Sequence, residues 1–133
     1  VCAAHLMGKD PASVFKTLVT QGASGAYYVF VVPAACSLDL KAGARAVGEK
    51  SIGMIRQAQL FPLTGYVHGG CSPIGMKKQF VTVLDQSAER LEHMTVSAGK
   101  IGFQVELAPG DLCRCVRGRF APVSRQDERE LPD

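Results

Sequence analysis

The sequence has no tryptophan and no cysteine pair spaced as Cys-x-x-Cys, and aromatic residues make up only 7% of its 133 positions. It also lacks an apolar run of about eighteen residues, which excludes a membrane-spanning helix. Its five cysteines are odd in number, which argues against a disulfide framework and favours a reducing compartment such as the cytoplasm. Cys113 and Cys115, with three scattered histidines, do not have the spacing of a zinc site. We therefore expect no metal, no other cofactor and no membrane partner.

The length and composition fit one globular domain. Apolar residues make up 47% of the chain and charged residues 20%, which suits a core that needs no covalent staples. Residues 1–123 carry 13 Lys and Arg against 8 Asp and Glu, a net charge of +5, whereas residues 124–133 carry 2 against 4, a net charge of −2. We expect a single basic domain over 1–123, suited to a polyanionic partner, and a flexible charged tail over 124–133.

Apolar periodicity and turn residues predict many short elements. The expected helices lie at 2–7, from Ser37 or Asp39 to 47, at 51–59, at 87–90 as a single turn, and at 109–116. The expected strands lie at 14–19, 26–32, 64–67, 79–84, 94–97 and 102–107, and residues 120–123 close the core. This arrangement predicts an α/β (mixed α+β) fold with a largely antiparallel mixed sheet, partly closed and wrapped by helices.

The most distinctive stretch is 68–78, where three glycines and a proline precede two lysines. Glycines allow the backbone to approach a ligand closely, so amide groups here can face a carbonyl or phosphate oxygen. A P-loop is excluded because Met76 stands where the phosphate-binding lysine is required, and no Ser or Thr follows it. Two interpretations stay open from this motif, an anion-binding loop and a tight turn that ends in solvated lysines.

One predicted strand carries a charge on an apolar face. Period two places Lys16 on the same face as Val14 and Leu18. One interpretation is an edge strand on which the lysine reaches solvent and discourages aggregation. The other is a cation that points into a pocket, where weak solvent screening makes it effective against a substrate oxygen.

Five segments in register point to a known family. They are VFKTL at 14–18, LDLK at 38–41, GYVHGGCSPIGMKK at 65–78, SAGK at 97–100 and ELAPGDL at 106–112. Together they resemble the bacterial YbaK-type aminoacyl-tRNA deacylases, and the resemblance extends from about Gly8 to Ala121. That family belongs with the editing domains of prolyl-tRNA synthetases. The resemblance implies a trans-editing hydrolase that removes amino acids from mischarged tRNA.

The resemblance also implies roles for individual residues. Lys16 falls at the position of the family's essential lysine and is the predicted catalytic residue. Gly69 and Pro73 begin and end the family's Gly-x-x-x-Pro signature. The predicted substrate-binding residues are Gly69, Gly70, Ser72, Pro73, Ser97 and Gly99. The predicted tRNA-binding residues are Lys77, Lys78 and Lys100, for each of which a solvated surface lysine is the alternative interpretation.

The specificity that the resemblance implies is for cysteine misattached to tRNA(Pro). In the mechanism proposed for the family, the substrate's own thiol attacks its ester carbonyl. That would account for the absence of an evident protein nucleophile, since no serine has an evident histidine partner and His68 is interpreted as a surface-loop histidine. Cys71 is the disfavoured alternative nucleophile, because no base for it is identifiable.

The partners implied are the acceptor end of tRNA(Pro) and a transient complex with prolyl-tRNA synthetase, with no DNA. Two alternative functions stay open, an alanyl-tRNA(Pro) deacylase and a non-catalytic tRNA-binding module. Two departures from the family pattern bear on activity. Family members usually have an additional N-terminal segment before the first helix, and Gln104 stands where an acidic residue is frequent.

Overall fold

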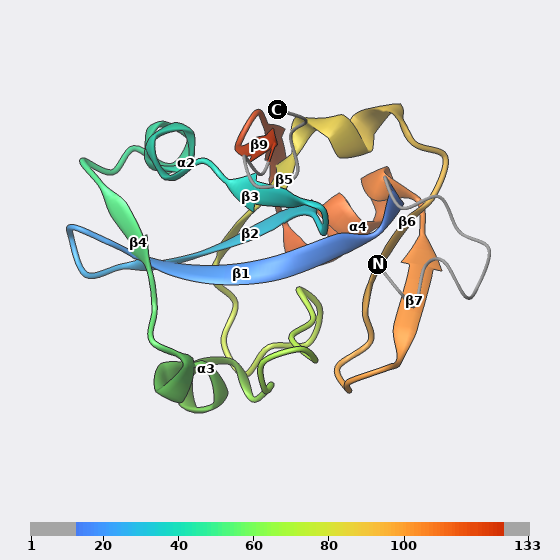
Figure 1. Cartoon of the computed structure of the whole chain (residues 1–133), viewed down its shortest axis with the longest axis horizontal. Coiled ribbons are helices and arrows are strands. Elements are labelled where there is room, and N and C mark those ends of the chain that lie inside the picture. The colour runs from blue at the N-terminus through green and yellow to red at the C-terminus, as the bar shows by residue number, and fades with distance from the viewer. Residues whose placement is uncertain (1–12, 127–133) are drawn as a thin grey trace, which may run out of the picture.

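A five-stranded mixed sheet forms the centre of the computed structural model, which describes residues 13–126 (Figure 1). In order across the sheet, its strands are β4 (Ile52–Met54), β1 (Phe15–Gly22), β2 (Tyr27–Pro33), β5 (Val81–Asp85) and β8 (Arg119–Ala121). β1 pairs antiparallel with β2 and β4, whereas β5 pairs parallel with β2 and β8. Within the described residues β4 and β8 are the edges of this sheet, which does not close into a barrel.

Two smaller antiparallel pairs complete the strands of the described chain. They are β3 (Cys36–Leu38) with β9 (Ser124–Gln126), and β6 (Met94–Ser97) with β7 (Gln104–Leu107). The mixed α+β architecture expected from the sequence is therefore confirmed. Residues 124–126, expected as the start of the flexible tail, instead form β9, in which Ser124 pairs with Leu38. The helix expected at 2–7 lies outside the described residues.

The predicted hairpin of β1 and β2 is confirmed and forms the middle of the sheet. Its turn closes through a hydrogen bond from the Gly22 amide to the Ala26 carbonyl at 2.8 Å, and Gly25 adopts a φ of 94° that favours glycine. β2 lies between β1 and β5, so both of its edges are paired, and side chains of the rest of the core pack on both of its faces. This position explains the continuous apolar run at 29–32, where every residue is fully buried.

Most helices begin and end where the local chemistry predicts. Asp39 caps α2 (Leu40–Val47) by accepting hydrogen bonds from the first turn, and Gly48 ends it with a φ of 74°. Pro109 begins α4 (Pro109–Val116), and the predicted turn at 87–90 is the 3-10 helix η2 (Gln86–Arg90). No helix in residues 13–126 is long and apolar enough to cross a membrane.

The segment 51–67 differs from its prediction. A helix was expected at 51–59, but residues 52–54 form β4 and the helix α3 (Gln57–Thr64) begins later. The strand expected at 64–67 is absent from the described structure because Thr64 still belongs to α3, and Gly65 ends that helix with a φ of 86°. Pro62 lies inside α3, where a proline removes a backbone donor and argues against a helix, so the sequence offers no reason to extend a helix through it.

The sheet is covered on both faces. On one face α2 packs over Phe30, Val32 and Val83, and Val123 from the end of the core joins this cluster. On the other face α4 and β6 pack over a second cluster that includes Phe15, Val31 and Leu84. A third, smaller cluster joins Val19 and Val29 to Cys71, and so attaches the glycine-rich loop at 65–80 to the same sheet.

A buried carboxylate joins the end of β5 to the C-terminal part of the fold. Asp85 is 3% exposed, and its Oδ1 accepts hydrogen bonds from the amides of Val123 at 3.0 Å and Ser124 at 2.9 Å. Its Oδ2 accepts from Ser87. Burial alone would raise the pKa of this carboxyl, but these hydrogen bonds together outweigh burial and lower the pKa below its ordinary value.

Candidate functional site

The candidate site lies along the free edge of β1. Among the described strands, β4 pairs with β1 only at Thr20–Gly22, and at the other end Thr95 of β6 forms a single bridge with Val14, the residue before β1. In Figure 1, β4 lies to the left of the unpaired stretch of β1 and β6 to the right, while α3 and the glycine loop lie below β1. The edge borders a cavity of about 330 Å³. The cavity is lined by Val14, Phe15, Lys16, Thr17, Leu18, Ala34, Leu60, His68, Gly69, Cys71, Ser97 and Gln104.

Lys16 lines this cavity from the paired part of β1. Its backbone position is fixed by antiparallel pairing opposite Val32 of the fully buried strand β2. Its side chain is half-buried and makes no hydrogen bond or ion pair with any residue from 13 to 126. An ammonium group that is partly shielded from water and not neutralised by a neighbouring carboxylate is suited to attract a substrate oxygen.

Two buried polar atoms in the cavity lining have no hydrogen-bond partner within the described chain. They are Thr17 Oγ1 and the side-chain oxygen Oε1 of Gln104. Because the great majority of buried polar groups are hydrogen-bonded, two such atoms in one cavity indicate a place for a polar ligand. The sequence pattern indicates no role for Thr17, and Gln104 stands out in the sequence only as a departure from the family that the chain resembles. The available signal was the period of β1, which places Thr17 between the buried residues Phe15 and Val19.

Of the two adjacent glycines in the loop, only Gly69 lines the cavity. It adopts a φ of 88°, a conformation that favours glycine. Gly70 is buried against the turn between β6 and β7, and a Cβ there would lie 3.1 Å from the Ile101 nitrogen and 3.2 Å from the Lys100 carbonyl carbon. The close approach expected of Gly70 is therefore to this turn of the protein and not to the cavity.

Ser72, Pro73 and Gly99 also lie outside the cavity lining. Ser72 is 3% exposed, and its Oγ accepts a hydrogen bond from the Ile74 amide at 3.2 Å. Gly99, with a φ of 103°, lies against the ring of Tyr66, whose hydroxyl donates to the Ile74 carbonyl at 2.6 Å. These contacts give Ser72 and Gly99 a part in shaping the loop and the turn beside it, and Pro73 is buried between Ser72 and Ile74 in the sequence of the same loop.

Ser97 does line the cavity, as the last residue of β6. Its Oγ accepts a hydrogen bond from the Gly99 amide at 3.3 Å, so its hydroxyl hydrogen is available to a ligand. The cavity thus brings together Lys16, Gly69 and Ser97 of the predicted site, from three segments that are distant in the sequence.

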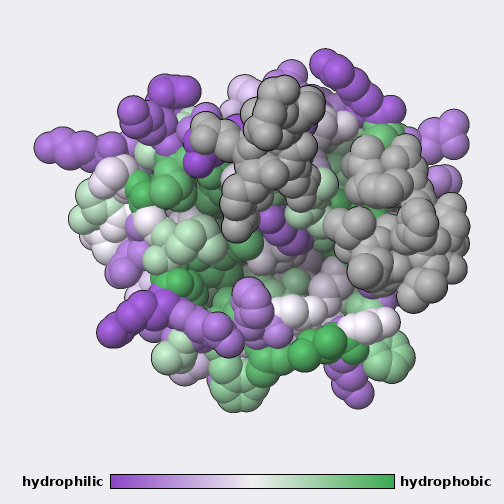
Figure 2. Space-filling model, in the orientation of Figure 1, coloured by the Kyte–Doolittle hydropathy of each residue, from purple (hydrophilic) through white to green (hydrophobic). Residues whose placement is uncertain are grey.

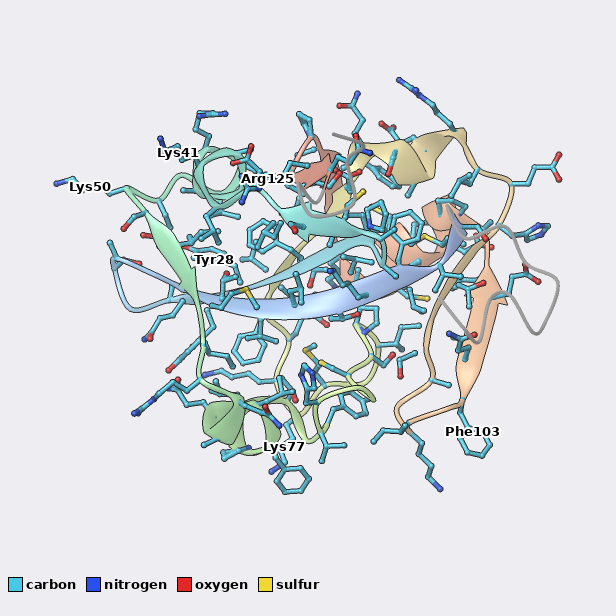
Figure 3. All side chains as sticks on the ribbon, viewed as in Figure 1. Tyr28, Lys41, Lys50, Lys77, Phe103 and Arg125 are labelled. Atoms are coloured by element: carbon cyan, nitrogen blue, oxygen red, sulfur yellow. The ribbon has the colours of Figure 1, made fainter. Side chains whose placement is uncertain are left out.

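The lysines predicted to bind tRNA lie outside the cavity. Lys77, Lys78 and Lys100 are all exposed, and none of them lines it. Lys77 lies on the outer side of α3 in Figure 3, with its Nζ 5.1 Å from the centre of the Phe61 ring. Figure 2 shows apolar surface along this lower edge of the molecule, where the large exposed apolar residues of α3, the loop and the β6–β7 turn are Phe61, Val67, Ile101 and Phe103.

Cys71 and His68, a potential nucleophile and a potential base in the cavity lining, have contrasting environments. Cys71 is 8% exposed, and burial raises the pKa of its thiol to about 11, with a hydrogen bond to Thr64 offsetting only part of this effect. A thiol with so high a pKa is protonated at neutral pH, so Cys71 is a poor nucleophile. His68 is exposed at the mouth of the cavity.

A larger cavity of about 440 Å³ lies between α2 and β4, away from these residues. It is lined by Lys41, Arg45 and Lys50, together with Glu49. Glu49 already accepts hydrogen bonds from Ser24 and from the Tyr28 hydroxyl, which lower the pKa of its carboxyl. Because no unpartnered buried side-chain oxygen faces it among the described residues, we place the candidate site in the smaller cavity.

The described residues contain no cluster of three or more His, Cys, Asp and Glu side chains that could hold a metal ion. What the cavity offers is one cation, two buried acceptors, a serine hydroxyl and a glycine backbone. Such a set can bind and polarise a small polar ester or amide.

Comparison with known proteins agrees with this chemistry. The sequence profile described as "Aminoacyl-tRNA editing domain" matches residues 2–115. The chain belongs to this editing-domain family. A protein of Enterococcus faecalis (strain ATCC 700802 / V583), whose name is that of a Cys-tRNA(Pro)/Cys-tRNA(Cys) deacylase, EbsC, is 44% identical over 124 residues, which cover 93% of this chain and 76% of that protein.

Solved structures show the same editing-domain fold. The crystal structure of the hypothetical protein APE2540 has a TM-score of 0.85 at 25% identity, and the match covers 92% of this chain and 81% of that one. A crystal structure described as a trans-editing enzyme for prolyl tRNA synthetase has a TM-score of 0.84 at 24% identity, covering 92% of this chain and 77% of that one. The sequence resemblance and the fold class are thereby confirmed.

Proposed function

We propose that this chain is an aminoacyl-tRNA deacylase that hydrolyses cysteine from mischarged tRNA(Pro) in the cytoplasm. The observation that carries the proposal is the cavity at the free edge of β1, which is lined by Lys16 and by two residues with unpartnered buried acceptors. Membership of the editing-domain family and the name of the 44% identical relative support it.

The polar groups of the cavity match the parts of an aminoacyl ester. The Lys16 ammonium stabilises the negative charge that develops on the ester carbonyl oxygen. The α-ammonium group of the amino acid is a donor of hydrogen bonds, which Gln104 Oε1 and Thr17 Oγ1 can accept. Ser97 supplies a hydroxyl donor, and Gly69 lets the substrate lie close to the backbone.

The attacking group in this proposal is the thiol of the substrate. Its sulfur forms a bond to the carbonyl carbon, the ester C–O bond breaks, and the thiol proton ends on the released ribose oxygen. Water then hydrolyses the cyclic thioester to free cysteine. A thiol of the substrate that reacts distinguishes cysteine from proline better than a pocket of similar size for both can.

The macromolecular partners follow from the substrate. The body of residues 1–123 is basic, as suits a protein that binds the acceptor end of tRNA(Pro). Lys77 and Lys78 would contact phosphates beyond the cavity, since both are exposed outside it. A transient complex with prolyl-tRNA synthetase would supply recognition of the tRNA body.

Deacylation of two substrates tests the proposal. We expect Cys-tRNA(Pro) to be hydrolysed at least about 10-fold faster than Ala-tRNA(Pro), because only cysteine carries the attacking thiol. The measurement is loss of radiolabelled amino acid from each tRNA, alongside tRNA binding over a range of salt. Faster release of alanine would assign the alternative specificity, and salt-sensitive binding without turnover of either substrate would indicate a tRNA-binding module.

The proposal predicts that Cys71→Ala retains activity. The Cys71 thiol is protonated at neutral pH and the substrate supplies its own nucleophile, so we expect kcat to change by less than about 3-fold. Single-turnover deacylation of Cys-tRNA(Pro) measures the effect. A loss of about 100-fold or more, with an unchanged melting temperature, would make Cys71 the nucleophile and contradict attack by the substrate thiol.

A further inference from the structure

The candidate cavity continues along β1 into a second compartment of about 190 Å³. The two compartments share four lining residues and are therefore two halves of one groove. The shared residues are Thr17, Leu18, Leu60 and His68. The second half is lined in addition by Val19, Met54, Ile55, Arg56 and Gln57. Thus the groove extends from β6 and β7 at one end to β4 and the start of α3 at the other.

We propose that this second compartment binds the 3′-terminal nucleotide of the tRNA. The inference rests on the proposed function in one respect, which is that the substrate is an aminoacyl-tRNA. The aminoacyl ester is joined directly to the terminal ribose, so a nucleoside must lie beside the aminoacyl compartment. The four shared lining residues mark the place where the two compartments meet.

The lining of the second compartment has the chemistry of a nucleotide site. Val19, Ile55 and Leu60 provide an apolar wall, and Met54, a residue that is 50% exposed, also lines the compartment. A soft thioether and aliphatic groups suit the face of a base. The neighbouring Gln57 carries an amide that can both donate to and accept from a base edge.

Arg56 supplies the charge that a nucleotide requires. Its guanidinium is exposed and forms no ion pair with any residue from 13 to 126. A guanidinium can bind a phosphate through two parallel hydrogen bonds. The phosphate on the 5′ side of the terminal nucleoside would lie at this end, and the ribose would lie at the junction beside His68.

The competing path for the RNA leads over the β6–β7 turn. That side of the cavity exposes Lys100 and the apolar residues Ile101 and Phe103, which are 67% and 63% exposed. These side chains stand on open surface, whereas Arg56 and Met54 border a cavity that is continuous with the ester site. We therefore favour the compartment at β4 and α3 for the terminal nucleotide.

Binding of the trinucleotide CCA, measured by calorimetry or NMR titration, tests this inference without hydrolysis. We expect Arg56→Ala to weaken CCA binding by about 10-fold, and Arg56→Lys by less, because a point charge keeps part of the attraction to phosphate. The matched control is Arg90→Ala, which removes the same charge from an exposed position on η2, on the opposite side of the sheet from α3 in Figure 1. We expect CCA binding by that control to equal the wild type.

Kinetics provide a second readout. Arg56→Ala should raise KM for Cys-tRNA(Pro) by about 10-fold and leave kcat within about 2-fold, since the lost contact lies away from the reacting carbonyl. CCA binding that is lost with Arg56 in a protein without deacylase activity would support the compartment and refute the proposed function. Equal CCA binding by wild type and Arg56→Ala would overturn the inference, as would no binding by the wild type or a loss confined to Lys100→Ala and Phe103→Ala.

Discussion

Lys16→Ala is expected to lower kcat/KM for Cys-tRNA(Pro) by at least about 100-fold, the range found when one charge-stabilising group is removed from an active site. Lys16 is the cation that the structure places in the cavity lining. Without it, the developing negative charge on the ester oxygen would face the methyl group of an alanine beside Thr17. A water molecule in the vacated space would stabilise that charge less well, because it is neither charged nor held in position.

The folded state should survive this change. Lys16 is half-buried and forms no hydrogen bond or ion pair within residues 13–126, so its replacement leaves no buried group there without a partner. Melting temperature and single-turnover deacylation should therefore be measured on the same preparation. Lys50→Ala, which removes an exposed lysine from the other cavity, is the control and should retain activity. An active Lys16→Ala enzyme would disprove the assignment.

Asp85→Ala is expected to destabilise the fold by about 3 kcal/mol, because it leaves two backbone amides without their acceptor and removes charged hydrogen bonds. Both amides, of Val123 and Ser124, bond to the same carboxylate oxygen, and the Val123 side chain is fully buried. Asp85 thus attaches the last core residue and the start of β9 to the sheet. Chemical denaturation at neutral pH measures the loss.

The control for Asp85 is Asp111→Ala. Asp111 is exposed and pairs with Arg114 on the surface of α4, so its replacement should change stability by about 0.5 kcal/mol or less. A loss of stability in Asp85→Ala no larger than in Asp111→Ala would contradict the role given to the buried carboxylate.

The same carboxylate predicts how stability depends on pH. Its pKa in the folded state is below the value of 3.8 that it has when unfolded, so the unfolded chain binds its proton first as pH falls. The contribution of Asp85 is therefore complete at neutral pH and decreases below about pH 4, until the folded state is also protonated. Asp85→Asn should remove this part of the acid dependence in denaturation curves recorded between about pH 3 and 7. A variant with the wild-type slope over this range would refute it.

The sequence was sufficient to predict the helices and strands that have a local pattern, a turn or a cap of their own. The alternating pattern of β1, the glycine-containing turn before β2, the Asp39 cap and Pro109 at the start of α4 each define an element within a few residues. The segment 51–67 carries weaker signals. β4 is three residues long and exists because it pairs with β1 at Thr20–Gly22, a long-range contact that no local pattern announces.

The candidate site likewise contains residues that a local sequence signal reveals and residues that only the tertiary structure reveals. The charge on an apolar strand face drew attention to Lys16, but that pattern left two interpretations open, and only the family resemblance made Lys16 the predicted catalytic residue. Thr17 and Gln104 were not assigned to the site, because an unpartnered oxygen is visible only once the distance between β1 and β7 is known. The glycines at 69 and 70 predicted a close backbone approach to a ligand, but the sequence could not tell that Gly70 instead approaches the β6–β7 turn.

That packing of Gly70 has a consequence for substrate size. Gly69, which lines the cavity, is held by a neighbour whose backbone lies against Lys100 and Ile101, so the wall is positioned from behind. A side chain at position 70 would push loop and turn apart and move the wall without altering any residue in contact with substrate. Acceptance of a substrate with a bulkier amino acid could therefore evolve by substitution of Gly70, a residue that does not line the cavity.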